Sequence, residues 1–228
     1  MTKFMKFFKL DKVVLSFKNN AAPFLNGLTS NSLDKPQNAF LNIHGRIIAT
    51  FEQLKINEDE VLVIVEKIFL PDVFSHLDRY AKLGGVKIEQ PSDNVYFDLE
   101  GNAPPQEGDR VIPHKRGRLL ITKRILESNV SEEDFTLFRV KNNIPLQGVD
   151  FKDEMLLNIN EVDFVSFTKG CFLGQEPISK VHSRSKPTWQ LMAKYEDECN
   201  AEEKQKMTSK TLDPEMRRVL GFVFVSNR

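Results

Sequence analysis

The sequence predicts an α+β fold, in which strands and helices are mixed along one chain. Two runs of β-branched and aliphatic residues, at positions 13–17 and 61–65, are typical of strands, and the second run suits a strand that is covered on both faces. Residues 71–84 have the apolar spacing of an amphipathic helix, and residues 219–225 form a strongly apolar final strand. With 228 residues, 40% of them hydrophobic, the chain can fill a substantial core.

The first elements follow from local patterns. Residues 1–10 place lysines between aromatic residues, which favours a first element with its aromatic side chains packed inward over an amphipathic surface helix. This segment is too short and too charged to span a bilayer. The helix after the second strand is expected to begin at Pro71, to bury Val73 and Leu77 on one face and to end at Gly84.

The middle of the chain returns to strands before a second helix. Residues 86–89 alternate in polarity as a half-buried strand does, and after a turn at 91–94 another strand is expected at 95–99. Repeated glycine and proline make residues 100–118 loop-like, and we expect this segment to join two subdomains. A variant of the capping box at Ser131 starts the second helix. Its buried side is expected to contain Phe135, Phe138 and Val140.

The most informative run lies at 169–180, where Cys171 stands between Gly170 and Gly174. Glycines let the backbone approach a neighbour that a side chain would block. Lys169 would favour the thiolate form of the cysteine if both residues face the same cavity. The alternative is a glycine-kinked edge strand that carries an inert, buried cysteine.

Residues 169–176 closely resemble the K-G-C-[YF]-x-G-Q-E signature of the YgfZ family, folate-binding proteins related to the aminomethyltransferase (T-protein) of the glycine cleavage system. Three further segments resemble motifs of this family in the same order. Residues 24–31 are similar to F-L-x-x-L-T-N-D, residues 42–48 to N-x-x-G-R-I, and residues 139–145 to R-x-x-x-G-I-P. Asn143 stands where the last motif usually has glycine, and asparagine is the next best residue for a left-handed backbone.

The resemblance implies mixed α/β domains around a central channel, followed by a β-barrel domain. We therefore expect a folate-binding region at 1–185, built from two α+β subdomains joined near 100–118. Only 48 residues follow Lys180, so the C-terminal β domain, at 186–228, is expected to be a shortened barrel. Within it, the Glu- and Lys-rich segment 196–210 is expected to be an exposed loop or helix.

The resemblance also implies a tetrahydrofolate-type ligand in the channel and a role in the assembly or repair of iron-sulfur clusters, with indirect effects on tRNA modification. The aminomethyltransferase uses an aspartate just after the segment that matches residues 45–48, where this chain has Ala49 and Thr50. Neither side chain can relay a proton or stabilise charge as a carboxylate does. We therefore expect binding without turnover, with Cys171 as a possible functional thiol.

The candidate ligand-binding residues lie in or beside the family motifs. Glu154 is the carboxylate nearest to the position at which the transferase grips the pterin, and Asn158 matches the family's asparagine. A cation for the carboxylate tail of a folate could come from Arg46, Arg184 or Lys186. The full set is Asn42, Arg46, Glu154, Asn158, Lys169, Gly170, Cys171, Gly174, Gln175 and Glu176.

Gln175 and Glu176 are expected to lie on a strand, on which neighbouring side chains point to opposite faces. On that basis we expect Gln175 to structure the cysteine loop and Glu176 to face the channel.

Other functions have specific requirements. A one-carbon transferase would need a substitute carboxylate in the channel, such as Glu52 or Asp59. A scaffold that binds only other proteins would need no ligand site. A cysteine hydrolase would need a histidine near Cys171, for which His182 is the nearest in sequence.

Composition limits the partners. Lys plus Arg and Asp plus Glu are both 32, so no net charge attracts nucleic acid or an anionic membrane. The ligand patterns of a zinc site and the glycine-rich loops of nucleotide-binding proteins are not found, so no metal is predicted. With two cysteines and no recognisable secretory leader, we expect a cytoplasmic location with reduced thiols. The resemblance implies a folate-type molecule and iron-sulfur proteins as partners, and we expect a monomer.

Overall fold

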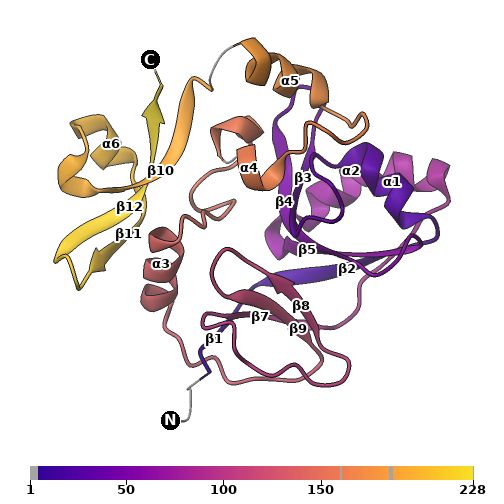
Figure 1. The fold of residues 1–228 in the computed structure, drawn as a ribbon, viewed down its shortest axis with the longest axis horizontal. Helices are drawn as coiled ribbons and strands as arrows, with labels where there is room; N and C mark the ends of the chain where they lie inside the picture. Colours follow the sequence, from indigo (N-terminus) through magenta and orange to yellow (C-terminus); the bar gives the residue numbers. More distant parts are fainter. Residues whose placement is uncertain (1–4, 160, 185–186, 228) are drawn as a thin grey trace.

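The computed structural model describes residues 5–159, 161–184 and 187–227, and these residues form three antiparallel sheets with helices between and around them (Figure 1). The predicted α+β class is confirmed. In Figure 1 the three-stranded sheet lies at the left and the five-stranded sheet at the upper right, with the four-stranded sheet below.

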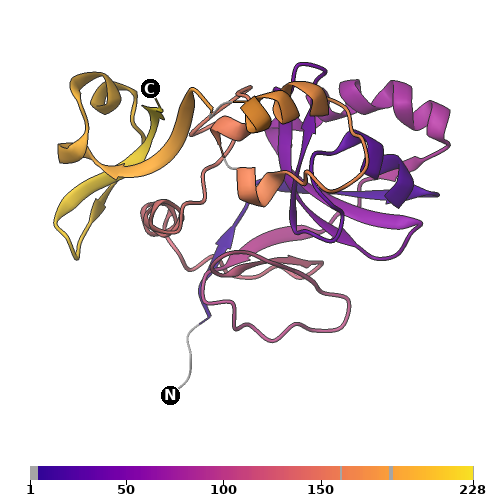
Figure 2. The ribbon, with the colours of Figure 1, turned by 45° about the horizontal axis from the view of Figure 1, so that its top comes forward.

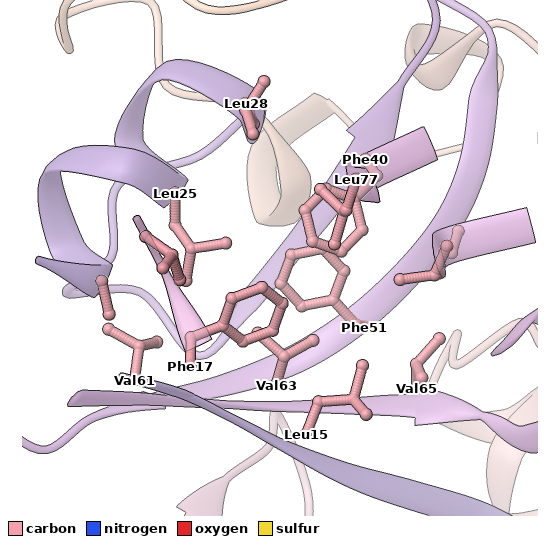
Figure 3. Close-up of a cluster of buried hydrophobic side chains, with 14 of the residues drawn as sticks. Leu15, Phe17, Leu25, Leu28, Phe40, Phe51, Val61, Val63, Val65 and Leu77 are labelled. Carbon is pink, nitrogen blue, oxygen red and sulfur yellow. The ribbon is translucent and has the colours of Figure 1, made fainter. Parts of the chain in front are cut away.

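The five-stranded sheet is the centre of the larger part of the molecule. Two of its strands are covered on both faces, as predicted for residues 61–65, because neighbouring residues point to opposite sides. Leu15 and Val63 pack toward two helices in the cluster of Figure 3, and Val14 and Ile64 pack toward the four-stranded sheet. In spatial order the strands are β3 (Gln37–Leu41), β4 (Ile47–Lys55), β5 (Glu60–Glu66), β2 (Lys12–Lys18) and β6 (Lys87–Glu89).

Two helices cover the outer face of this sheet. Helix α1 (Ala21–Leu28) contributes Leu25, and α2 (Leu70–Gly84), preceded by the short 3-10 helix η1 (Lys67–Phe69), contributes Val73 and Leu77. The predicted helix at 71–84 is confirmed. Gly84 is its last helical residue, and Gly85, with φ +64°, takes the left-handed position that ends it.

The four-stranded sheet packs on the other face of the five-stranded sheet. The strand expected at 95–99 is confirmed as β7, and the aromatic side chain of Phe7 is buried in β1, as expected for the first element. The segment 100–118 is not purely a loop, because it contains a short strand and connects two strands of this one sheet. In spatial order the strands are β1 (Phe7–Lys9), β7 (Asn94–Asp98), β9 (Arg118–Thr122) and β8 (Arg110–Pro113).

The second predicted helix is confirmed as α3 (Glu132–Lys141), which lies between the sheets (Figure 1). The Ser131 hydroxyl accepts the backbone N–H of Asp134 at 3.1 Å, as expected of the predicted capping residue. Phe135 and Val140 are buried, and Phe138 is half-buried.

The C-terminal sheet has three strands in the order β10-β12-β11, and it is open in the described residues, with β10 and β11 at its edges. The final strand predicted at 219–225 is confirmed as β12. The segment 196–210 contains two short helices and the start of β11, and most of its residues are exposed as expected. The elements are β10 (Trp189–Tyr195), η3 (Glu196–Glu198), α6 (Ala201–Lys206), β11 (Thr208–Asp213) and β12 (Arg218–Ser226).

Three short elements connect the larger part to this sheet: η2 (Leu156–Asn158), α4 (Glu161–Phe164) and α5 (Gln175–Arg184). Both views place α5 across one end of β3 and β4 (Figure 1 and Figure 2). The assignment of Gln175 and Glu176 to a strand is wrong, since both lie in the first turn of α5. Gly174, with φ +82°, turns the chain into this helix, and an acidic residue and a proline in the first turn favour a helix N-terminus.

Candidate functional site

The cysteine loop, defined here as residues 169–174, packs against the end of α1. The ammonium of Lys169 donates to the carbonyl oxygens of Thr29 and Asn31 at 2.7 and 2.9 Å. Burial lowers the pKa of Lys169 to about 8. The side chain of Cys171 is exposed and makes no hydrogen bond or ion pair with any described residue. Lys169 therefore anchors the loop to backbone carbonyls, and the thiol is open to another molecule.

The turn at residues 42–46 is built against the same loop. The side-chain oxygen of Asn42 accepts the backbone N–H groups of His44 and Arg46, at 2.9 and 3.1 Å. A Cβ atom on Gly174 would lie 2.4 Å from the carbonyl oxygen of Asn42, so glycine is required for this approach. Two segments that resemble family motifs are thus brought together, through Asn42 and Gly174.

The remaining residues of the cysteine run have different surroundings. The side-chain oxygen of Gln175 accepts the N–H of Phe172 at 3.3 Å, and this bond ties the cysteine loop to the first turn of α5. Glu176 is exposed in the first turn of α5. Gly170 has the amide nitrogen of Asn26 as its nearest neighbour, 4.0 Å from the position of a Cβ atom.

The residues expected to bind a pterin and its tail lie in that turn, beside it or at the end of α5. The guanidinium of exposed Arg46 donates to the carbonyl oxygen of Asp153 at 3.0 Å. The amide of Asn158 lies 3.4 Å from a carboxylate oxygen of Glu154. Arg184 is exposed at the end of α5, and Lys186 lies outside the described residues.

A second group of polar residues lines a small cavity of about 40 Å³ between the five-stranded sheet and the loops that follow β8 and α3. We call it the inner cavity. Its volume is close to that of one water molecule in the liquid. Its polar lining residues include Lys12, Gln37, Thr50, Glu52, Glu66, His114, Lys115, Asn143, Gln147 and Asp163.

A buried ion cluster forms one wall of the inner cavity. The ammonium of Lys12 lies 2.7 Å from a carboxylate oxygen of Glu52 and 3.1 Å from one of Glu66. Burial alone would raise the pKa of Glu52, but Lys12 and then His114 outweigh it and lower this pKa to about 2. Burial likewise opposes the charge of Lys12, yet the two carboxylates raise the pKa of Lys12 above its usual value. Both groups are therefore ionised near neutral pH.

His114 completes this wall. Its Nε2 atom lies 2.9 Å from the side-chain nitrogen of Gln37 and 3.6 Å from a carboxylate oxygen of Glu52. Its Nδ1 atom is buried and has no hydrogen-bond partner among the described residues. The Nδ1 atom of His114 can therefore form a hydrogen bond with a bound molecule or water.

A larger opening of about 510 Å³, which we call the outer cleft, lies between the end of α3 and the edge strand β10. It shares Lys115, Asn143 and Asp163 with the inner cavity, and a Lys115–Asp163 ion pair of 2.5 Å lies where the two meet. The lining residues are Lys115, Val140, Lys141, Asn143, Ile159, Asp163, Gln190, Leu191, Met192 and Ala193.

None of the ten predicted ligand residues lines the inner cavity or the outer cleft. Thr50 does line the inner cavity, where the side-chain oxygen of Gln147 accepts its backbone N–H at 2.7 Å. Ala49 is fully buried in the core. Sequence reasoning missed His114 and Asp163, whose only signal was polarity inside otherwise apolar or loop segments.

The R-x-x-x-G-I-P-like segment joins this region to the C-terminal sheet. Buried Arg139 donates to the carbonyl oxygen of Ile144 and to Asp150, at 3.0 and 3.1 Å, and to the hydroxyl of Ser209 in β11 at 3.0 Å. Asp150 also accepts the Ser209 hydroxyl at 2.6 Å. Asn143 has φ +53°, which confirms the left-handed backbone expected there.

The fold and the sequence match different known proteins. The structure superposes on the crystal structure of the glycine cleavage system aminomethyltransferase T from Bartonella henselae with a TM-score of 0.72, over 97% of this chain and 78% of that chain, at 11% identity. This match defines the class: the chain is an α+β protein with the T-protein fold. No protein-family model matches the chain.

In sequence the chain is similar to the iron-sulfur cluster assembly factor IBA57 homolog, mitochondrial, of Mycosarcoma maydis. The two are 26% identical over 167 residues, which is 63% of this chain and 41% of that protein. The match thus spans less than half the length of the relative. With the structural match, it confirms the predicted resemblance to the YgfZ and T-protein family.

The comparison does not support one cellular location over another. The name of the relative places that protein in mitochondria. Among the described residues, no helix combines the length and the apolar character that crossing a bilayer requires. The cytoplasmic location expected from the sequence stays a prediction.

Proposed function

We propose that the chain binds a reduced folate in the outer cleft and assists the assembly or repair of iron-sulfur clusters without turnover of its own. The observation that carries the folate half is the outer cleft, about 510 Å³ in volume and bordered by α3, α4 and β10 in a T-protein fold. Small-molecule sites in proteins typically have volumes of about 300–1,000 Å³. The inner cavity, at about 40 Å³, is too small for a pterin.

The cleft has the mixed lining that a pterin requires. Leu191, Met192 and Ile159 supply apolar surface, and Asn143 and Asp163 supply a donor and acceptors for the edge of the ring. This assignment replaces Glu154 as the pterin carboxylate with Asp163.

The two lysines of the cleft are the cations for an anionic tail, and both already have partners. Lys115 pairs with Asp163, and Lys141 pairs with Glu215 and Asp213, at 2.6 and 2.9 Å. A folate tail would exchange one carboxylate partner for another, so its binding is expected to gain little from charge and to depend only weakly on salt.

The residues around Thr50 support binding without turnover. The position of the transferase carboxylate is taken by Ala49 and Thr50, and Gln147 bonds to the backbone there. Turnover remains the second candidate, because Glu52 lines the inner cavity as a substitute carboxylate should. Its pKa of about 2 makes it a weak base at neutral pH, and exposed Asp59 accepts the N–H of Asn20 outside both cavities.

The iron-sulfur half of the proposal rests on Cys171 and on the similarity to a protein named as an iron-sulfur cluster assembly factor. No group of three potential metal ligands occurs among the described residues. A cluster bound at Cys171 would therefore take its other ligands from a second molecule. Effects on tRNA modification would be indirect, through modifying enzymes that carry such clusters.

Calorimetric titration with tetrahydrofolate and 5-formyltetrahydrofolate tests the folate half. Met192→Glu adds a charge to the outer cleft, and Met216→Glu adds the same charge at a similarly exposed methionine outside it; the two side chains are 43% and 54% exposed. We expect Met192→Glu to weaken binding at least about tenfold, equivalent to about 1.4 kcal/mol, and Met216→Glu and Cys171→Ala to leave it unchanged.

Other outcomes have definite meanings. Binding that is lost in Arg46→Ala but kept in Met192→Glu would move the site to the turn beside the cysteine loop. No binding of either folate to the unmodified chain would leave the protein scaffold as the remaining function. Release of product from a folate and an amine donor would favour the transferase.

A further inference from the structure

Half of strand β12 has a neighbouring strand on one side only. Strand β10 pairs with β12 as far as the pair Trp189–Ser226. Strand β11 pairs with β12 only from Arg218 to Phe222, where Thr208 is the last partner. Residues 223–225 therefore have no partner strand on the β11 side of β12 in the described part of the C-terminal sheet, and we call this side the free edge of β12.

The hydrogen-bond pattern shows which peptide groups this edge exposes. The N–H of Asn227 donates to the carbonyl of Thr188 at 3.0 Å, which makes these two residues a hydrogen-bonded pair of the ladder. Such pairs alternate along antiparallel strands, so Val225 and Val223 direct their N–H and C=O groups toward β10. The N–H and C=O of Phe224 point to the opposite side, where they meet no hydrogen-bond partner among the described residues.

A groove of about 460 Å³ lies along this edge, between β12 and the short helix α6. Trp189 contributes an aromatic ring with 45% of its surface exposed, on the same face of the sheet as Phe224. The lining residues are Glu154, Trp189, Asn200, Glu202, Glu203, Lys206, Phe224 and Ser226.

The charges of the groove favour a cation. Glu202 and Glu203 are neutralised by Lys206 and Lys194, at 2.7 and 3.0 Å. Glu154 has no ion-pair partner among the described residues, and its one side-chain contact is the amide of Asn158. A carboxylate beside an exposed indole ring is the combination that binds lysine and arginine side chains.

We propose that this groove binds an extended, basic segment of a partner protein, which adds to the free edge of β12 as a strand. One residue of the segment exchanges two main-chain hydrogen bonds with Phe224, as strand addition requires. Residues directly opposite in an antiparallel pair share one face of the sheet, so its side chain lies beside Trp189 and Glu154. An arginine or lysine fits that position. The proposal is independent of folate binding.

Trp189 is the only tryptophan of the chain, so its fluorescence reports directly on the groove. The probe is the blocked peptide acetyl-Thr-Val-Arg-Val-Thr-amide, titrated into the full chain. We expect a saturable blue shift of the emission. A peptide with glutamate in place of arginine, and one with a methyl group on the arginine backbone nitrogen, should each bind at least about tenfold more weakly, since each loses one of the two recognition features.

A matched pair of variants locates the cation contact. Glu154→Gln should weaken the arginine peptide several-fold and leave a peptide with alanine at that position unaffected. Glu127→Gln changes an exposed carboxylate outside the groove and should have no effect.

Four results would overturn the proposal. These are no change in Trp189 emission, equal binding of the N-methylated peptide, an equal shift with free arginine amide, and an emission spectrum that depends on protein concentration alone. The third would indicate a site for a small amine, and the last would indicate that a second copy of the chain covers the groove.

Discussion

Replacing Lys12 with methionine tests the account of the buried ion cluster. The Lys12 side chain is 6% exposed and lies between Glu52 and Glu66, whose side chains are 12% and 18% exposed. Methionine keeps the length of the side chain but leaves two buried carboxylates without their cation. Removing one partner of a buried ion pair costs about 3–5 kcal/mol, and we expect the free energy of unfolding at pH 7 to fall by this amount.

The shift in the pKa of Glu52 gives an independent magnitude. Its ordinary value is 4.5 and its value in the folded chain is about 2, and each unit is worth about 1.4 kcal/mol, so the ionised form contributes about 3 kcal/mol. Because the folded pKa is the lower one, this contribution is fully present above pH 4.5 and is lost as the pH falls toward 2. Without Lys12, burial raises the pKa of Glu52, so the variant should lose less stability relative to the unmodified chain at pH 5 than at pH 7.5.

Urea unfolding followed by circular dichroism at pH 7.5, 6 and 5 measures both effects. Lys18→Met is the matched control, since Lys18 lies on the same strand and pairs with Glu89 at 2.6 Å at the surface, where an ion pair contributes little. The double variant Lys12→Met with Glu52→Gln should regain part of the loss. A Lys12→Met protein that differs from the unmodified chain by less than about 1 kcal/mol, with no dependence on pH, would refute the reasoning.

Three further predictions follow from single residues. Cys171 is exposed and should react rapidly with a disulfide reagent in the folded chain. Cys199 is 7% exposed and burial raises the pKa of its thiol, so it should react only on unfolding. Equal rates would contradict these exposures. Asn143→Ala should lower the free energy of unfolding by about 1–2 kcal/mol because of its positive φ, whereas Asn143→Gly should be nearly neutral; equal losses would show that the side chain matters and the backbone does not. Burial lowers the pKa of His76, so the unfolded chain binds a proton at this residue more tightly than the folded chain does. The urea midpoint of unfolding should therefore fall as the pH drops below about 6.5. His76→Phe should reduce this dependence of the midpoint on pH, and an unchanged dependence would exclude His76 as its source.

The elements that the sequence predicted are those whose own residues suffice to specify them. Strands β5 and β12 have apolar runs, and helix α2 has an amphipathic pattern. These patterns reflect burial and do not depend on how the elements are connected. The start of α5 was assigned incorrectly because a glycine-rich turn hides the change from loop to helix. Strand β8 is four residues long and lies among glycines and prolines, so no periodicity marks it.

The cavities could not be predicted, because their linings come from distant parts of the chain. His114 and Lys115 lie in the turn between β8 and β9, Asp163 in α4 and Met192 in β10. Sequence motifs identified the cysteine loop and the turn at 42–46, which contact each other in the structure. Those motifs contain the residues that shape the backbone, and the polar residues around the cavities belong to none of them except Lys141 and Asn143.

The guanidinium of Arg139 joins helix α3 to the C-terminal sheet, and this joint lies between the outer cleft and the free edge of β12. Arg139 fixes β11 to the end of α3, the same end that supplies Val140, Lys141 and Asn143 to the outer cleft. The opposite wall of the cleft is β10, which is hydrogen-bonded to β12. A tilt of the sheet about this joint would change the width of the cleft and move the free edge of β12 at the same time. If both places bind a molecule and such a tilt couples them, each molecule alters the affinity of the other by an equal factor.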